Sequence, residues 1–218
     1  MRRVGVVVLA AGRSTRFAGG RASKLLTPLH GIPMVRHAVT AAVEADVGDV
    51  VVVTGDRPTE VADALAGLPI RLAHEPNFAD GMATSLGCGV RASMACDAVI
   101  IALGDIPAAR PEGYRRVAAT WRRSGAIIVV PRYAGSTHPS HPTLFAATVF
   151  GELLMLRGDV GAREVIAQDP SRVVEAPLEW PAPDDIDTVE DLDRVGVLPL
   201  QANREPSPTI PVKTDESR

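Results

Sequence analysis

Small and basic residues follow an apolar run near the start of the sequence, and their types favour binding of an anion. The run at residues 4–10 leads into Ala11 and Gly12, and small residues let backbone N–H groups approach a ligand closely. Arg16 and Lys24 then add two positive charges. Because loops of this kind at the carboxyl ends of strands bind phosphates, we expect a nucleoside triphosphate here.

The same loop has a plainer interpretation as a tight strand-to-helix turn with solvated basic side chains, since such turns are common. It does not match the Gly-x-x-x-x-Gly-Lys-Ser/Thr loop of Walker-type sites, and it lacks a Gly-x-Gly-x-x-Gly pattern with an acid about 20 residues later. Both of those sites are therefore disfavoured. An oxidoreductase that uses NAD is the weakest functional interpretation.

Two acidic segments far apart in the sequence offer ligands for a divalent cation. Asp105 follows the apolar run at residues 98–103, and Asp187 lies in the acidic segment 184–188. Mg²⁺ is usually bound through one or two protein carboxylates together with substrate phosphates, so these two acids suit it. Each also has a structural interpretation: Asp105 as an ordinary turn residue, and Asp187 or Thr188 as the N-cap of the last helix.

Apolar runs rich in β-branched residues alternate with segments of helical periodicity, which predicts an α/β fold whose sheet is covered on both faces. The predicted strands are residues 4–10, 50–54, 70–73, 98–103, 126–130 and 172–175. The predicted helices are residues 33–45, 60–66, 112–123, 146–156, 162–168 and a last helix that ends at Val195. Residues 188–191 resemble a capping box that opens this last helix.

The composition of the 218 residues is that of a globular protein, with 46% hydrophobic and 22% charged residues. The net charge of −3 gives no reason to expect a nucleic-acid partner. Cys88 and Cys96 are too few for a disulfide framework, which favours a reducing, cytoplasmic location. No apolar run approaches the roughly 20 residues that span a bilayer, so no membrane association is expected. We expect a single domain over residues 1–198 and a proline-rich, disordered tail over residues 199–218.

Four segments, taken together and in this order, resemble the motifs of the molybdenum cofactor nucleotidyltransferases, or MobA-like NTP transferases. They read Leu-Ala-Ala-Gly-x-Ser-x-Arg (9–16), Lys-Leu-Leu-x-Pro-Leu (24–29), Leu-Gly-Asp-x-Pro (103–107) and Asp-Ile-Asp-Thr-x-Glu-Asp-Leu (185–192). Residues 77–86, 141–145 and 158–163 support the resemblance, which covers about residues 4–195. The cytidylyl branch is the most similar.

This resemblance implies a three-layer, Rossmann-like fold of the nucleotide-diphospho-sugar transferase type, with a mostly parallel mixed sheet. It implies a Mg²⁺-dependent enzyme that transfers a nucleotide, CMP from CTP, to the phosphate of the pterin molybdopterin and releases pyrophosphate. A molybdoenzyme that receives the product is an expected partner.

The resemblance also implies roles for individual residues. Leu9, Ala10, Ala11 and Gly12 would contact the nucleotide, Arg16 and Lys24 would hold its phosphates, and Asp105 and Asp187 would hold the metal, with Arg16, Lys24 and Asp105 the catalytic set. Ser85 would lie near the sugar or base, although the N-cap of a helix is an equal alternative. His141 and Arg163 would face the acceptor, although a structural histidine and a surface arginine are comparable alternatives.

Two departures from the family pattern bear on these roles. Residues 17–23 lengthen the loop between Arg16 and Lys24, and Pro139 replaces an arginine that could meet an acceptor phosphate. A sugar phosphate, an alditol phosphate or another cofactor precursor therefore stays open as the acceptor. A non-catalytic maturation partner is less favoured, because the basic loop and both acids are present. A zinc site at His138 and His141 is not expected, because no third ligand is near in sequence.

Overall fold

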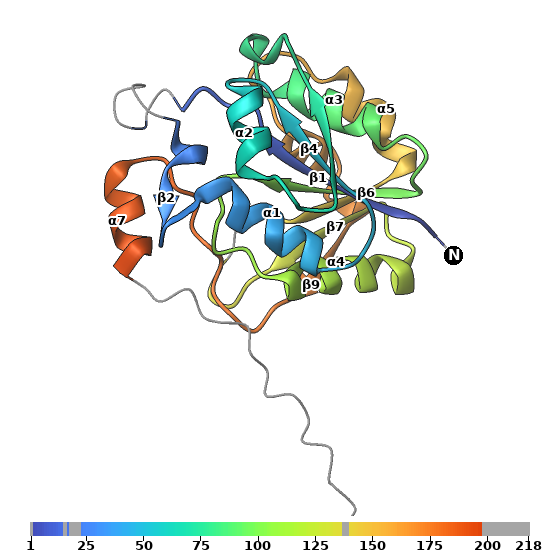
Figure 1. Ribbon diagram of the computed structural model, residues 1–218. Helices are drawn as coiled ribbons and strands as arrows, with labels where there is room; N and C mark the ends of the chain where they lie inside the picture. Colours follow the sequence, from blue (N-terminus) through green and yellow to red (C-terminus); the bar gives the residue numbers. More distant parts are fainter. Residues whose placement is uncertain (1, 15–16, 18–22, 137–139, 198–218) are drawn as a thin grey trace, which may run out of the picture.

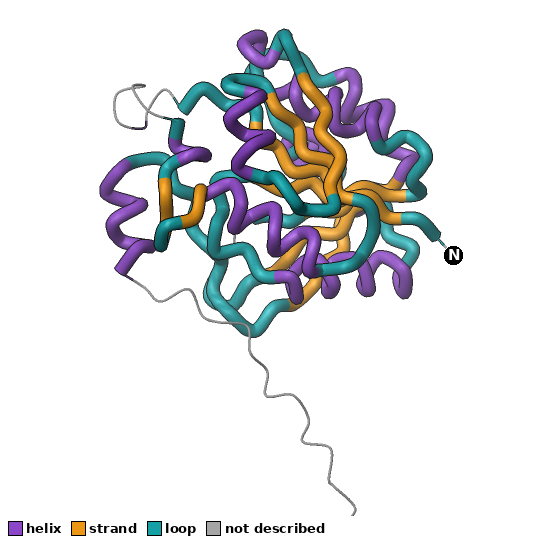
Figure 2. Tube along the Cα trace, in the orientation of Figure 1, coloured by secondary structure: helices purple, strands orange, loops and turns teal. Residues whose placement is uncertain are grey.

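The computed structural model describes residues 2–14, 17, 23–136 and 140–197, and in it a seven-stranded sheet lies between two layers of helices (Figures 1 and 2). The strands are β1 (Val4–Ala10), β4 (Val50–Thr54), β5 (Ile70–His74), β6 (Ala98–Leu103), β7 (Ile128–Arg132), β8 (Thr143–Ala146) and β9 (Val173–Pro177). Their order is β5-β4-β1-β6-β8-β7-β9. Only β8 among these seven runs antiparallel to its neighbours, so the expected mostly parallel mixed sheet is confirmed.

Two layers of helices cover the sheet. One layer holds α1 (Met34–Glu44), α2 (Pro58–Ala64) and α4 (Pro111–Ser124), and the other holds α3 (Met82–Ala92), α5 (Phe150–Met155) and α6 (Arg163–Gln168). A hairpin of β2 (Pro28–Leu29) and β3 (Ile32–Pro33) lies outside the sheet, and α7 (Val189–Val197) lies beside it in Figure 1. The expected three-layer α/β architecture is therefore confirmed.

Strand β1 shows why the sheet needs cover on both faces. Val6 and Val8 are fully buried in the core beneath α1 and α4, whereas Val7 is fully buried beneath α3. Successive side chains of a strand point to opposite faces, so an unbroken run of valines fits only a strand with a core on each side. The bounds predicted for β1, β4 and β6 match those observed.

Other elements differ from the prediction. The helix expected over residues 146–156 is divided into the end of β8, a 3-10 helix at residues 147–149 and α5. Helix α2 begins at Pro58, since proline suits the first turn of a helix. The strand predicted at residues 126–130 begins two residues later. Helix α3, strand β8 and the β2–β3 hairpin were not among the predicted elements, although the capping alternative for Ser85 placed the start of a helix near α3.

Arginine side chains bind the carbonyl groups at the ends of several helices. Arg115 of α4 donates to the carbonyls of Glu44 and Ala45 at the end of α1, and Arg36 of α1 donates to those of Ala64 and Ala66 at the end of α2. Arg71, Arg157 and Arg172 serve α3, α5 and α6 in the same way. The last carbonyls of a helix have no partner within it, so these bonds satisfy them, and those of Arg36, Arg71 and Arg115 also tie neighbouring elements together.

None of the helices in the described part of the chain combines the length and the apolar character required to cross a membrane. The predicted tail at residues 199–218 lies outside the described residues, and the single-domain interpretation of residues 1–198 stays a prediction.

Candidate active site

A cavity of about 560 Å³ opens at the carboxyl ends of β1 and β6. In a parallel sheet this edge is where loops from neighbouring strands meet and where ligands bind. Thirteen described residues line the cavity: Leu9, Ala11, Gly12, Arg13, Phe78, Ala79, Asp80, Gly81, Met82, Ser85, Leu103, Asp105 and Asp159. The set includes Leu9, Ala11, Gly12 and Ser85, which the resemblance assigned to the nucleotide, and Asp105, which it assigned to the metal and the nucleotide site.

The loop after β1 forms one wall of this cavity. Leu9, Ala11 and Gly12 line it, and a Cβ atom at Gly12 would meet no described atom within 4 Å. The space beside Gly12 is therefore open among the described residues. Ala10 is buried in the core on the α1 side and is not among the lining residues. Arg16 lies outside the described residues.

Lys24 brings the two acidic segments together. Its Nζ atom lies 2.6 Å from Oδ2 of Asp105 and 2.9 Å from Oδ1 of Asp187. The three side chains are 13%, 20% and 29% exposed, so each is largely shielded from water. The carboxylates expected to share one cation thus do lie together, and the cation between them is the lysine ammonium.

The position of Asp187 follows from its neighbours. The backbone N–H of Ile186 donates to the carbonyl oxygen of Asp105, and the Ile186 side chain is fully buried against Phe17, Leu29 and Met34. These contacts pin the segment beside the end of β6. Because Ile186 points inward, its neighbour Asp187 is carried to the lysine.

Thr188, rather than Asp187, caps the last helix. The hydroxyl of Thr188 accepts from the backbone N–H of Asp191, and the Asp191 carboxylate accepts from the N–H of Thr188. This reciprocal pair is the predicted capping box. The Asp187 carboxylate bonds Lys24 instead.

Burial and the two neighbouring carboxylates act in opposite directions on the pKa of Lys24. Burial by itself lowers the pKa of the ammonium, but the charges and hydrogen bonds of Asp105 and Asp187 outweigh it, so the pKa of Lys24 is raised above 10.5. Lys24 is therefore a cation at neutral pH. Its backbone N–H is held as well, by the hydroxyl of Ser14 in the β1 loop.

The acids fit a hard divalent cation. Oδ1 of Asp105 is buried and has no hydrogen-bond partner among the described residues, although Oδ2 binds Lys24. Two carboxylates are the protein share that Mg²⁺ commonly takes, with substrate phosphates and water completing its ligands. The described residues hold no cluster of three or more His, Cys, Asp or Glu side chains with metal-binding geometry. The expected absence of a zinc site stays a prediction, because His138 lies outside them.

The opposite wall of the cavity is the start of α3. Ser85 is 6% exposed and lies within the helix, which begins at Met82 with Gly81 as its N-cap. The capping alternative for Ser85 is therefore wrong. The backbone N–H of Ala83 donates to the carbonyl oxygen of Gly158. This bond joins α3 to the segment that carries Asp159.

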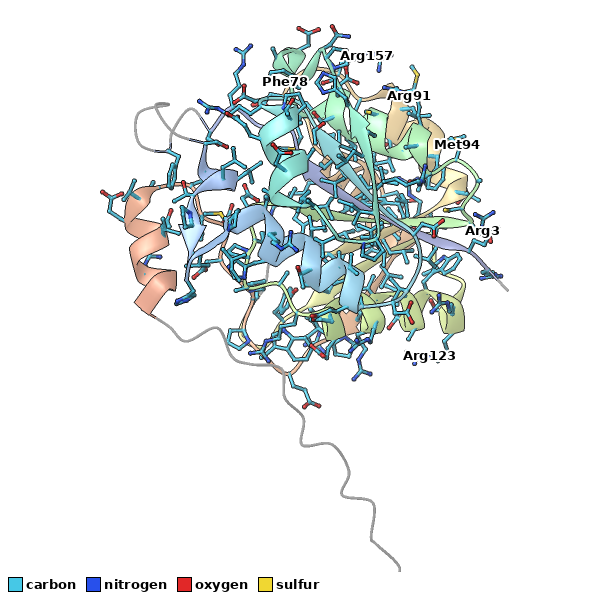
Figure 3. The ribbon with its side chains drawn as sticks, in the orientation of Figure 1. Arg3, Phe78, Arg91, Met94, Arg123 and Arg157 are labelled. Atoms are coloured by element: carbon cyan, nitrogen blue, oxygen red, sulfur yellow. The ribbon has the colours of Figure 1, made fainter. Side chains whose placement is uncertain are left out.

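Arg13 and Phe78 lie together at the cavity and were not assigned by sequence reasoning. The Arg13 guanidinium lies 5.3 Å from the centre of the Phe78 ring, a cation–π contact. Figure 3 labels Phe78 and Arg157 in the upper part of the molecule. The segments that carry Phe78 and Arg157 come together at Gly81 and Gly158, where a Cβ atom on Gly81 would overlap the backbone of Gly158. Asp80, Met82 and Asp159 were missed too: the motif segments 77–86 and 158–163 contain them, but residue type alone does not show that these segments face each other.

His141 lies beside β6, where the charges of Asp105 and Asp185 act on its imidazole. The Nδ1 atom of His141 is 3.2 Å from the carbonyl oxygen of Ile101. The backbone carbonyl of His141 accepts a hydrogen bond from the Tyr133 hydroxyl. Burial lowers the pKa of the imidazole, and the charges of Arg163 and Asp105 act on it in opposite directions. Arg163 is exposed at the start of α6. His141 and Arg163 are not among the residues that line the cavity.

The fold and the site define the class of protein. A mostly parallel sheet carries a small-residue loop at its first strand, and a lysine and two acids gather beside a cavity at its carboxyl edge. That is the arrangement of a nucleotidyltransferase. The family comparison agrees: residues 6–173 match the MobA-like NTP transferase domain, and the chain belongs to this family.

Curated relatives are similar in sequence to this chain over most of its length. The bifunctional protein GlmU of Rhizobium leguminosarum is 30% identical over 162 residues, which are 72% of this chain and 34% of the relative. The chain thus spans about a third of the length of that protein. The 2-C-methyl-D-erythritol 4-phosphate cytidylyltransferase of Corynebacterium diphtheriae is 34% identical over 158 residues, which are 67% of this chain and 63% of the relative.

Solved structures show the same fold. Rv0371c from Mycobacterium tuberculosis is 28% identical with a TM-score of 0.77, over 89% of this chain and 97% of that one. The same protein has also been solved in complex with manganese, at 27% identity and a TM-score of 0.69, over 88% of this chain and 97% of that one. A nucleotidyl transferase from Methanothermobacter is 26% identical with a TM-score of 0.77, over 89% and 96% of the two chains.

Proposed function

We propose that this protein transfers CMP from CTP to the terminal phosphate of molybdopterin and releases pyrophosphate. The observation that carries the proposal is the meeting of Lys24, Asp105 and Asp187 beside a cavity whose wall is the small-residue loop of β1. The motifs of the cytidylyl branch support CTP as the nucleotide. A non-catalytic binding protein would have no need of two carboxylates at this place.

The chemistry requires positioning more than a strong base. The second pKa of an acceptor phosphate is near 6, so its oxygen is largely ionised at neutral pH. That oxygen forms a bond to the α-phosphorus of CTP while the bond to the β-phosphate oxygen breaks, and pyrophosphate leaves with the electron pair. The barrier comes from bringing one anion against another, and fixed positive charge lowers it.

Each residue of the site has a role in this reaction. Lys24, together with Arg16, would neutralise the phosphates, and Leu9, Ala11, Gly12 and Ser85 would enclose the nucleotide. Asp105 and Asp187 would hold Mg²⁺, which when bound neutralises charge on the α-phosphate and the leaving group. His141 and Arg163 would face the acceptor, and burial lowers the pKa of the His141 imidazole, which disfavours its charged form.

A second acceptor class has specific support. Pro139 replaces the family arginine that could meet the pterin phosphate, and one relative named above is a cytidylyltransferase of an alditol phosphate. The alternative function is therefore transfer of a nucleotide to a sugar phosphate, an alditol phosphate or another phosphorylated precursor by the same site.

The test is a transfer assay with each of the four α-³²P-labelled nucleoside triphosphates, Mg²⁺, and either molybdopterin or a set of sugar and alditol phosphates. We expect pyrophosphate release and a labelled product only with CTP and molybdopterin, and mass analysis should show the added CMP. Transfer only to another phosphate would support the alternative. No transfer to any acceptor would contradict both.

The variant Asp105→Asn checks that this site performs the transfer. It keeps the size of the side chain but removes the charge, so we expect Mg²⁺-dependent transfer to be abolished while the circular dichroism spectrum stays native. Activity close to that of the wild type would show that Asp105 does not hold the metal.

A further inference from the structure

Lys24 is unusual in this chain because lysine is nearly absent from it. The sequence has 23 basic residues, and only Lys24 and Lys213 are lysines. Arginines bind the ends of helices throughout the scaffold. Lys24 is the one lysine within the described residues, and it lies at the acidic pair.

The ammonium of Lys24 and a divalent cation need the same oxygen atoms. Lys24 takes Oδ2 of Asp105 at 2.6 Å and Oδ1 of Asp187 at 2.9 Å. A second cation on this pair would meet the positive charge of the lysine at close range in a partly shielded site, where such repulsion is stronger than in water. Metal and lysine therefore compete for the pair.

The structure also indicates from which side the metal would arrive. Asp105 lines the cavity, whereas Lys24 is not among the lining residues and follows the β1 loop. Oδ1 of Asp105 is buried and has no partner among the described residues. The lysine thus holds only one oxygen of Asp105, but a cation bound by both acids would still meet the ammonium that lies between them.

We propose that Lys24 serves as an internal counterion that blocks the metal site until a nucleotide draws its ammonium onto the phosphates. The inference rests on the proposed function only in that the site binds a nucleotide together with a divalent cation. Metal alone must displace the lysine with no compensating partner, whereas metal and nucleotide arrive with phosphates that can accept it. Binding of the two is therefore coupled, and by linkage the coupling is reciprocal.

The first test is a titration with MnCl₂ alone, in which free Mn²⁺ is followed by electron paramagnetic resonance. Lys24→Met removes the charge at similar length, and we expect it to bind Mn²⁺ at least about tenfold more tightly than the wild type, within the usual range of coupling between sites. Lys24→Arg keeps a cation and should bind as weakly as the wild type. Lys213→Met is the matched control for the substitution and should also match the wild type.

The double variant Lys24→Met, Asp105→Asn shows whether the gained site is the acidic pair, because it should lose the added affinity. Equal Mn²⁺ affinity in natively folded Lys24→Met and wild-type protein would overturn the proposal. So would a gain in Lys24→Met that survives Asp105→Asn.

A second measurement uses the wild type, so it does not depend on whether a variant folds. Protein labelled with ¹⁵N-lysine has only two Nζ signals, and the one missing in Lys24→Met belongs to Lys24. We expect Mg²⁺ alone to leave this signal in place, and Mg²⁺ with α,β-methylene-CTP to shift it and couple it to ³¹P. An unchanged Lys24 signal in the nucleotide complex would overturn the proposal.

These experiments separate the inference from the function. The metal titration needs neither an acceptor nor turnover. Absence of any transfer activity in the wild type, together with a gain of Mn²⁺ affinity in Lys24→Met, would refute the enzyme assignment and keep the counterion. CMP transfer by the wild type, with no gain of Mn²⁺ affinity in Lys24→Met, would support the enzyme assignment and refute the counterion.

Discussion

At the scale of single residues, the motifs identify Lys24, Asp105 and Asp187 but say nothing of how they meet. Asp105 and Asp187 lie far apart in the sequence, and their convergence depends on the buried Ile186, which pins one segment to the other. The pairing of the acids was predicted through a shared metal. Lys24 was predicted only as a ligand of phosphate, because the spacing of residues in the sequence does not show which side chain lies between the two carboxylates.

His141 gives a prediction about pH. Burial lowers the pKa of its imidazole below 6.5, and the charge of Arg163 lowers it further, while the bond to Ile101 and the charges of Asp105 and Asp185 oppose this without reversing it. The unfolded chain therefore binds a proton at a higher pH than the folded protein. The contribution of this histidine to stability is complete above pH 6.5 and is lost as the pH falls below it.

We expect the free energy of unfolding in urea to fall more steeply between pH 7 and pH 5 in the wild type than in His141→Asn. Asn keeps an amide that can donate to Ile101 but cannot titrate. One titrating proton changes the slope of the free energy of unfolding against pH by at most about 1.4 kcal/mol per pH unit. Identical slopes in the two proteins would show that the histidine is as free to ionise when folded as when unfolded.

At the scale of elements, strands buried on both faces were predicted best. Strands β1, β4 and β6 read as unbroken apolar runs because both faces are covered, and their bounds follow from the residues alone. Strand β8 has only four residues and leads directly into a 3-10 helix, so its pattern merges with the helix that follows.

Helix α3 was missed because it is rich in small residues, which usually indicate loops. The structure gives the reason for one of them. A Cβ atom on Gly89 would overlap Val7, so this glycine lets α3 approach β1 closely. Because the need for glycine at this position comes from β1, it does not appear as a helical periodicity in the sequence of α3.

The junction between α3 and the loop at Gly158 is the element on which the shape of the cavity depends. Gly81 has φ of +118°, and a Cβ atom there would overlap the backbone of Gly158. We expect Gly81→Ala to lower the free energy of unfolding by about 1–3 kcal/mol, a typical cost of overpacking. We also expect it to weaken CTP binding, because Gly81 and Asp159 both line the cavity.

Gly151→Ala is the matched control in α5. A Cβ atom at Gly151 would meet nothing within 4 Å, so alanine should leave CTP binding unchanged and stabilise the helix by about 0.5–1 kcal/mol. Urea unfolding and calorimetric titration with CTP measure both effects. Equal behaviour of the two variants would show that the Gly81–Gly158 contact does not constrain the site.

At the scale of the whole molecule, arginine side chains join helices that the sequence does not link. Arg115 is the clearest case, since it spans from α4 to two carbonyls at the end of α1. No sequence pattern predicts these bonds, because the acceptors are backbone groups and carry no residue type. The layered architecture, by contrast, was predictable from alternating apolar periodicity.

We expect Arg115→Met to lower the free energy of unfolding by about 1 kcal/mol, a modest value because the side chain is 50% exposed. Arg115→Lys should recover only part of this, since an ammonium lacks the fork that serves two carbonyls. Arg116→Met, at an exposed neighbour on α4, is the control and should change little. Urea unfolding measures all three, and equal losses for Arg115→Met and Arg116→Met would contradict the bridging role.

The reversed direction of β8 has a consequence for how this scaffold can diversify. Because β8 runs against β6 and β7, the connection that precedes it ends at the sheet edge where the parallel strands also end. Two independent stretches of chain, the β1 loop and the described part of the β7–β8 connection, therefore lie at the same edge of the sheet. Under the proposed function, insertions or replacements in the β7–β8 connection would change the acceptor while the β1 loop that receives the nucleotide is inherited intact.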